Sequence, residues 1–235
     1  MRLLASSILV LALVAALCST MSVQAQRMSP EDAQAAWTLQ ASHVAGKLEL
    51  SKEQTTKLVD AYRKARESYP EVLGKARKEA RAKAAPEERR GMGRIMREVQ
   101  QKVAKAETEK FAKDVGTFLG KKKTKQAARQ LGRFSGSLDK IVNIVAGLEL
   151  DKAKQAKALD IVSAYDAEST AARQKAMAGG DRDAMRAVSE TQRAKLNEAM
   201  SKVLSEEEFR TWVRTVGGRP PRSSARGGGE GSPNR

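Results

Sequence analysis

The chain has 235 residues and a formal net charge of +16, from 44 Lys and Arg against 28 Asp and Glu. Aromatic residues make up only 4% of it, and strong helix formers such as Ala, Lys, Glu and Leu are abundant, which argues against a large β-sandwich or barrel. One Cys and one His leave little room for any mechanism that needs a cluster of either residue. The composition therefore predicts an all-α protein.

The first 25 residues have the pattern of a secretory signal peptide. Arg2 supplies a short positive region, Leu3 to Leu17 are mostly apolar, and Val23-Gln24-Ala25 places small residues at positions −3 and −1 of a cleavage site. The alternative is an uncleaved anchor, but this apolar stretch is shorter than the roughly 20 residues that span a bilayer. We expect cleavage near Ala25, export to the periplasm or the extracellular space, and no transmembrane segment afterwards.

A short repeat divides the rest of the chain. Residues 44–52 (VAGKLELSK) match residues 145–152 (VAGLELDK) apart from the inserted Lys47 and the change of Ser51 to Asp151. Each copy precedes a long helical pattern containing an Ala-Tyr pair. We interpret this as a duplication, with coincidence in a helix-rich sequence as the alternative. The predicted organisation is a signal peptide (1–25), helical unit 1 (29–134), helical unit 2 (137–216) and a tail (217–235) rich in Arg, Gly, Pro and Ser. That tail is too poor in apolar residues to fold, so we expect it to be disordered.

In the first unit, two apolar stripes with helical spacing predict two long helices joined by a short turn. The first stripe keeps its phase through Pro70, which indicates a kink rather than a helix end. Pro86, followed by Glu87 and Glu88, is typical of a helix start. Lys121, Lys122 and Lys123 are interpreted as an exposed linker. The stripes consist of Leu58, Tyr62, Ala65, Tyr69, Val72 and Ala76, and of Met92, Met96, Val99, Val103, Ala106, Phe111, Val115 and Phe118.

The second unit repeats this plan in a shorter form. One helix is predicted from about Asp151 to Ala178, Gly179-Gly180 ends it, and Asp181 is a good N-cap for the next helix. A final short helix is expected from Ser205. Their buried sides are predicted to carry Leu159, Val162 and Tyr165, then Met185, Val188, Gln192, Leu196, Met200 and Val203, then Phe209, Trp212 and Val216. The expected fold is two tandem long helical hairpins with short flanking helices.

Positive charge is concentrated in the first unit. Residues 44–143 hold 26 basic and 13 acidic side chains, whereas residues 145–216 hold 12 of each. The tail adds four Arg and one Glu. This uneven distribution indicates an anionic partner for the first unit, since an uncompensated positive field attracts anions and accelerates encounter.

Two capping motifs stand at helix starts. In Leu50-Ser51-Lys52-Glu53-Gln54, Ser51 is placed to accept from the backbone N–H of Gln54, and the Gln54 side chain to reach back to Ser51. In Leu204-Ser205-Glu206-Glu207-Glu208, Glu208 takes the reciprocal place, and Phe209 is positioned for a hydrophobic staple with Leu204. A capping box alone is common and structural.

With these two motifs, the sequence from Trp37 to Val216 resembles the Spy/CpxP-like family of periplasmic proteins, known for an L-T-x-x-Q motif on a small helical scaffold. Leu50, Ser51 and Gln54 match with Ser for Thr, and Leu204 and Ser205 match with Glu208 replacing Gln. The resemblance implies a helical cradle, usually a dimer, whose basic and partly apolar face binds unfolded clients without ATP. Two units in one chain would then form a fused pseudo-dimer.

The sequence gives little support for a metal or a catalytic centre. Some relatives in that family are linked to metals, but a tight zinc site needs about four ligands, and the predicted mature chain offers only His43 among its His and Cys residues. A packing or solvent-edge role is the preferred interpretation of His43. No Cys nucleophile, G-x-S-x-G sequence or glycine-rich phosphate loop is present after the signal peptide. We therefore expect no enzyme and no cofactor.

The candidate client-binding surface is a run of cations in the first unit, beside one methionine that offers adaptable apolar contact. A solvated helix face is the alternative, but cations outnumber acids there two to one, so pairing between residues i and i+4 cannot neutralise them. The predicted client-binding residues are Arg63, Lys64, Arg66, Lys75, Arg77, Lys78, Arg81, Arg89, Arg90, Met92, Arg94 and Arg97.

These observations predict an exported, ATP-independent chaperone or holdase of the envelope-stress type that binds unfolded or acidic proteins. One alternative is an envelope adaptor that binds anionic polymers such as lipid headgroups, cell-wall material or nucleic acid. Nucleic acid is disfavoured because the basic stretch lacks aromatic residues for stacking. Another alternative is a regulator of a membrane sensor.

Overall fold

The computed structural model describes residues 28–85, 91–178 and 182–217, and every regular element within these ranges is a helix, which confirms the predicted all-α class. The predicted signal peptide, the helix start at Pro86, the break at Gly179-Gly180, the N-cap Asp181 and the tail from residue 218 lie outside the described residues. The helices are α2 (Pro30–Lys47), α3 (Lys52–Lys83), α4 (Met92–Gly116), α5 (Lys121–Leu131), α6 (Gly136–Gly147), α7 (Lys152–Ala178), α8 (Arg182–Ser201) and α9 (Glu206–Gly217).

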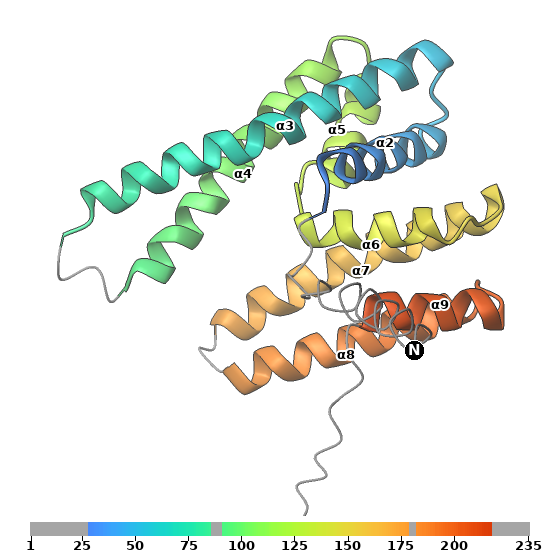
Figure 1. Ribbon diagram of the computed structural model, residues 1–235. Helices are drawn as coiled ribbons and strands as arrows, with labels where there is room; N and C mark the ends of the chain where they lie inside the picture. Colours follow the sequence, from blue (N-terminus) through green and yellow to red (C-terminus); the bar gives the residue numbers. More distant parts are fainter. Residues whose placement is uncertain (1–27, 86–90, 179–181, 218–235) are drawn as a thin grey trace, which may run out of the picture. The chain divides into compact units, whose positions relative to one another are not determined.

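Two long helix pairs account for most of the packing between elements. Helix α3 packs along α4, and α7 packs along α8, with each pair running in opposite directions (Figure 1). Helix α5 packs on α4, whereas α6 packs on α7 and α9. Helix α3 runs through Pro70 without ending, as the sequence predicts.

The buried apolar residues form two clusters. One is built by α3, α4 and α5 around Tyr62, Phe111 and Val115, and the other by α6 to α9 around Val162, Met200 and Trp212. Helix α2 contributes to both, because Ala36 belongs to the second cluster while Ala41 and its neighbours belong to the first. A helix with buried residues on two sides shows only a weak amphipathic pattern, so its role as the common element is hard to read from sequence.

The stripe predicted for α3 is wrong in its C-terminal half. The buried residues of this helix are Leu58, Tyr62, Arg66 and Leu73, whereas Val72 is 37% exposed. The predicted stripe repeats every 3.5 residues, and such a repeat drifts around a straight helix of 3.6 residues per turn. The same drift applies to α4. Ala106 belongs to the predicted apolar stripe but is exposed, and the neighbouring Glu107 is buried instead.

The interpretation of Lys121, Lys122 and Lys123 as a linker is also wrong. These lysines form the first turn of α5, whose side chains Ala127 and Leu131 are buried in the first cluster. Three cations are unfavourable at the positive end of a helix dipole. Packing of the two apolar residues therefore determines that this segment is helical, and the charge pattern hides it.

The two copies of the sequence repeat form the same kind of turn. Glu49 and Glu149 have positive φ angles of 49° and 50°, a conformation that commonly ends a helix. The next helix is then capped by Ser51 in the first copy and Asp151 in the second, each accepting a hydrogen bond from the backbone N–H three residues later. The repeat therefore encodes a helix–turn–helix corner that precedes α3 and α7.

Both capping boxes have their reciprocal hydrogen bonds. At α3, Ser51 Oγ accepts from Gln54 N at 3.2 Å, and Gln54 Oε1 accepts from Ser51 N at 3.2 Å. At α9, Ser205 Oγ accepts from Glu208 N at 3.3 Å, and Glu208 Oε2 accepts from Ser205 N at 2.6 Å. Leu204 and Phe209 lie in one apolar cluster, as a staple requires, and Leu50 packs against the other cluster.

Candidate binding surface

The ends of α3 and α4 that lie nearest their connecting segment form a strongly basic two-helix layer. We call residues 74–85 and 91–106 the basic arm; they contain nine Lys or Arg and two Glu. None of these residues is buried: the last buried residue of α3 is Leu73, and the first of α4 is Glu107. The arm is thus held by a thin layer of contacts between two helices only.

Several arm cations have no acidic partner among the described residues. Lys75 pairs with Glu71 at 2.7 Å, and this hydrogen bond raises the pKa of Lys75 above its ordinary value. Arg94 pairs with Glu98 at 2.9 Å, and Arg77 donates to Gln100 Oε1 at 2.8 Å. Lys105 lies 4.0 Å from Glu109, and the half-buried Arg77 has no acidic partner. The exposed arm cations without an ion pair among the described residues are Lys78, Arg81, Lys83, Arg97 and Lys102.

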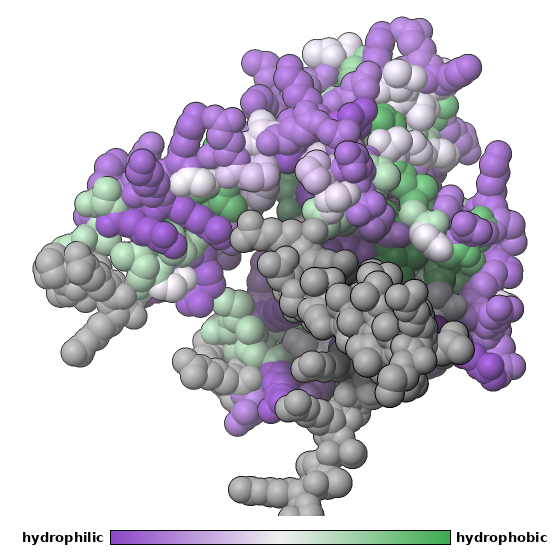
Figure 2. All heavy atoms as spheres, viewed as in Figure 1, coloured by the Kyte–Doolittle hydropathy of each residue, from purple (hydrophilic) through white to green (hydrophobic). Residues whose placement is uncertain are grey.

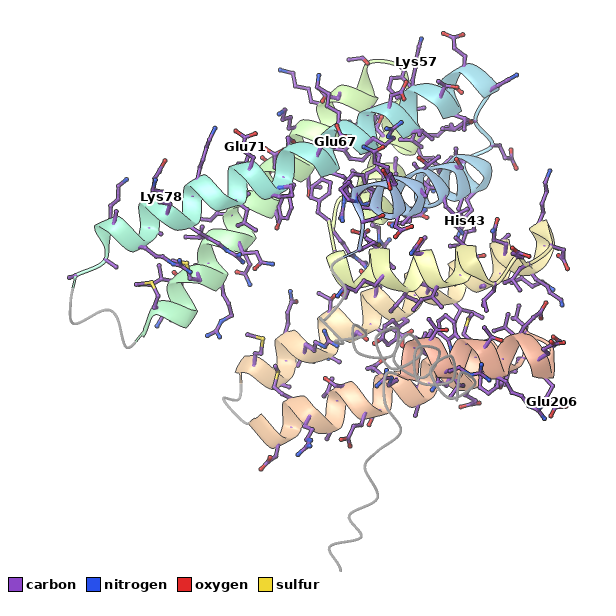
Figure 3. All side chains as sticks on the ribbon, viewed as in Figure 1. His43, Lys57, Glu67, Glu71, Lys78 and Glu206 are labelled. Atoms are coloured by element: carbon purple, nitrogen blue, oxygen red, sulfur yellow. The ribbon has the colours of Figure 1, made fainter. Side chains whose placement is uncertain are left out.

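These free cations stand on the solvent side of the arm. Figure 3 shows Lys78 and Glu71 projecting from the side of α3 that faces away from α4. Arg81 and Arg97 are exposed as well. Arg89 and Arg90, also predicted as binding residues, lie outside the described residues.

Apolar side chains border the cations. Met92 and Met96 are half-buried, and Figure 2 shows apolar atoms interspersed with hydrophilic ones on the arm. The other half-buried apolar residues of α4 in the arm are Ile95, Val99, Val103 and Ala104. A two-helix layer has no third element to cover these side chains, so they keep apolar area that a bound chain would remove from water.

One predicted binding residue is placed elsewhere. Arg66 is 6% exposed and forms an ion pair with Asp139 of α6, so its guanidinium group is not available to a client in this conformation. Arg63 is half-buried and donates to Gln34 Oε1 at 3.0 Å, whereas Lys64 is exposed. The candidate binding surface therefore consists of the basic arm and Lys64. Arg63 lies at its edge, and Arg66 is not part of it.

The buried pair is part of a polar network between α2, α3 and α6. Gln40 Nε2 donates to Asp139 Oδ1 at 3.0 Å, and Tyr62 Oη donates to Gln40 Oε1 at 3.1 Å. The Arg66 guanidinium group also lies 5.2 Å from the ring centroid of Trp37, within the range of a cation–π contact. Burial raises the pKa of Asp139, and the nearby Arg66 charge opposes that rise.

Sequence reasoning missed this network, although a signal was present. Arg66 follows Leu58 and Tyr62 at steps of four, which places a cation on the buried side of α3. Asp139 likewise adjoins Leu138 and precedes Val142 by three residues on the buried side of α6. A single cation and a single acid on two apolar faces indicate a buried pair, because neither charge would be buried alone.

A second contact joins α2 to α7. His43 Nε2 lies 2.8 Å from Asp160 Oδ1, and Lys47 Nζ lies 2.7 Å from the same oxygen. Burial tends to raise the pKa of Asp160, but the hydrogen bonds from Lys47 and His43 outweigh it and lower that pKa. His43 thus has a structural partner, and no group of three His, Cys, Asp or Glu side chains suited to a metal ion occurs in the described ranges.

Tyr62 gives the network a measurable alkaline signature. Burial, with a further contribution from Asp139, raises the Tyr62 pKa far above its ordinary value of 10.0. The folded state therefore holds this proton more tightly than the unfolded state, so the stabilisation is complete below pH 10 and declines as the pH rises above it. In an alkaline titration we expect Tyr62 to ionise only as the helical circular-dichroism signal is lost.

The Tyr62→Phe variant is the control for this titration. It should lack the part of the tyrosinate absorbance change that Tyr62 contributes when the helices unfold. Ionisation of all three tyrosines with the helical signal intact would contradict the burial of Tyr62.

Comparison with protein-family models, curated proteins and solved structures finds no match to this chain. Within the described ranges, no helix combines the length and the apolar character needed to cross a bilayer.

Proposed function

We propose that the protein is an exported, ATP-independent chaperone of the holdase type, which binds unfolded or acidic polypeptides through the basic arm. One observation carries this proposal: five exposed cations without an acidic partner among the described residues border half-buried apolar side chains on a two-helix layer that contains no buried residue. Such a surface attracts an anionic chain over a distance and then offers apolar contact at short range. Both interactions are available to many client sequences.

The arrangement of the helices is part of the same proposal. We propose that the α3–α4 and α7–α8 pairs are the two halves of a fused pseudo-dimer that forms a cradle of the Spy/CpxP type. The identical corner before α3 and α7, with positive φ angles at Glu49 and Glu149, supports descent of both pairs from one unit. The Gln54 side chain, which donates to the Phe118 carbonyl at 3.3 Å, and Glu208, which pairs with Lys154 at 3.0 Å, give the two capping motifs similar roles at helix junctions.

Client protection is expected to depend strongly on salt. At 0.1 M ionic strength the Debye length is about 10 Å, and at 1 M it is about 3 Å, so high salt screens the field of the arm while leaving apolar contact in place. We expect near-stoichiometric protein to suppress aggregation of several unrelated clients at low salt and several-fold more to be needed at 1 M. Light scattering of the client during heating measures this.

Truncation after Val216 is the companion variant for the salt series. It removes four Arg and one Glu but leaves all nine arm cations. If the truncated protein still protects clients and this protection declines with salt, the basic arm is the binding surface. If truncation abolishes protection, the tail is the binding segment. No protection at low salt, together with steeply salt-dependent binding of nucleic acid or anionic vesicles, would favour the adaptor function instead.

A further inference from the structure

A groove on the second helix group has the chemistry of a separate ligand site. It lies between α6, α7, α8 and α9 and has a volume of about 380 Å³, which is within the range of small-ligand sites. We infer that this groove binds a polypeptide segment in which aliphatic side chains alternate with carboxylates. The inference rests on the proposed function in that it assumes binding of unfolded chains, but it assigns the contact to a surface other than the basic arm.

The lining combines aliphatic surface with positive charge only. Ile141 and Ile144 of α6, with Leu196 of α8, supply the aliphatic part. The charged residues that line the groove are Lys140, Arg173 and Arg193, and the described lining contains no Asp or Glu. Lys140 and Arg173 have no ion pair among the described residues, whereas the Arg193 guanidinium group is anchored to the Val216 carbonyl at the end of α9.

The net charge of this region does not explain an all-cationic groove. Residues 136–217, which supply all four helices, contain 13 acids and 13 bases, so the composition of these helices does not favour cations. The acids are gathered elsewhere: Glu149, Glu207 and Glu208 line a separate depression of about 310 Å³ that has no cation in its lining. The groove lining is thus more cationic than the helices that supply it, which favours an anionic occupant.

The number of donors favours a ligand with several acidic groups. Lys140 of α6 and Arg173 of α7 bring about eight N–H donors to the groove. The hydroxyl groups of Ser189 and Thr215 already donate to the carbonyls of Met185 and Thr211. One carboxylate accepts about four hydrogen bonds, so a single-headed amphiphile would leave part of this lining without a partner. An extended segment, by contrast, presents aliphatic side chains on one face and carboxylates on the other. The protein's own tail is excluded by charge, because it holds four Arg and one Glu.

Fluorescence anisotropy with a labelled peptide of alternating Leu and Glu tests this assignment. In the groove variant, Lys140→Gln and Arg173→Gln remove two exposed cations from the lining. The matched control, Lys152→Gln and Lys157→Gln, removes two exposed α7 cations that line no described groove. We expect the groove variant to bind about tenfold more weakly and the control to change by less than about twofold, since each exposed pair contributes up to about a factor of five.

The outcomes separate the groove from the proposed function. The assignment is supported if only the groove variant loses affinity for the Leu-Glu peptide and the wild type does not bind the corresponding Leu-Lys peptide. This holds even if the wild type fails to protect any aggregating client. The assignment is overturned if both variants bind the Leu-Glu peptide equally weakly, or if neither variant binds it more weakly than the wild type. Binding of an aliphatic carboxylate such as dodecanoate without binding of the peptide would also overturn it, as would concentration-dependent self-association that the groove variant abolishes.

Discussion

Replacing Asp139 with Ala is expected to lower the free energy of unfolding by about 3–5 kcal/mol, because the buried Arg66 would lose its counter-charge. Arg66 is 6% exposed, so water cannot solvate the charge that remains, and arginine does not shed its proton in proteins. Gln40 would lose the acceptor of its 3.0 Å hydrogen bond at the same time. Urea unfolding followed by circular dichroism measures the loss.

Two further variants make this test specific. The double variant Arg66→Met, Asp139→Leu is expected to lose much less stability than Asp139→Ala, because it leaves no buried charge without a partner and only the Gln40 donor loses its acceptor. Asp160→Ala breaks the contact of His43 with an acid that is 49% exposed. It should lower the free energy of unfolding by about 1 kcal/mol or less. If Asp139→Ala and Asp160→Ala had equal effects, the Arg66–Asp139 pair would not be buried in solution.

Reversing three arm charges is expected to raise by about tenfold the protein concentration needed for half-maximal client protection, since the field of the arm governs encounter with anionic chains. The variant is Lys78→Glu, Arg81→Glu, Arg97→Glu. All three residues are exposed and have no ion pair among the described residues, so the helices should remain folded. The aggregation assay at low salt measures the effect.

The control for this variant changes the net charge of the protein by the same amount in another place. Lys152→Glu, Lys157→Glu, Lys175→Glu alters three exposed cations of α7 and should leave protection nearly unchanged. Similar loss of protection in both variants would show that total charge rather than the arm determines binding. At 1 M salt, the difference between the two variants should largely disappear.

The local patterns of the sequence predict the helices well and the buried faces less well. A capping box needs residues only three apart, so Ser51 with Gln54 and Ser205 with Glu208 specify the starts of α3 and α9 without reference to the rest of the chain. The phase of a long apolar stripe is harder to predict, because a small error in the assumed number of residues per repeat accumulates along the helix. Leu73 is buried in place of the predicted Val72 for this reason.

For the binding surface, the sequence by itself determined how much positive charge the first unit carries and that apolar residues accompany it. It also determined the corner before each long helix, since the repeat includes the residues that end one helix and cap the next. Only the tertiary structure decided which cations remain in water. Arg66 and Lys64 belong to one basic stretch, yet Arg66 meets an acid 73 residues away while Lys64 stays exposed. The physical reason is that burial of a charge depends on which two faces meet, and contacts between distant segments are not encoded in the spacing of either one.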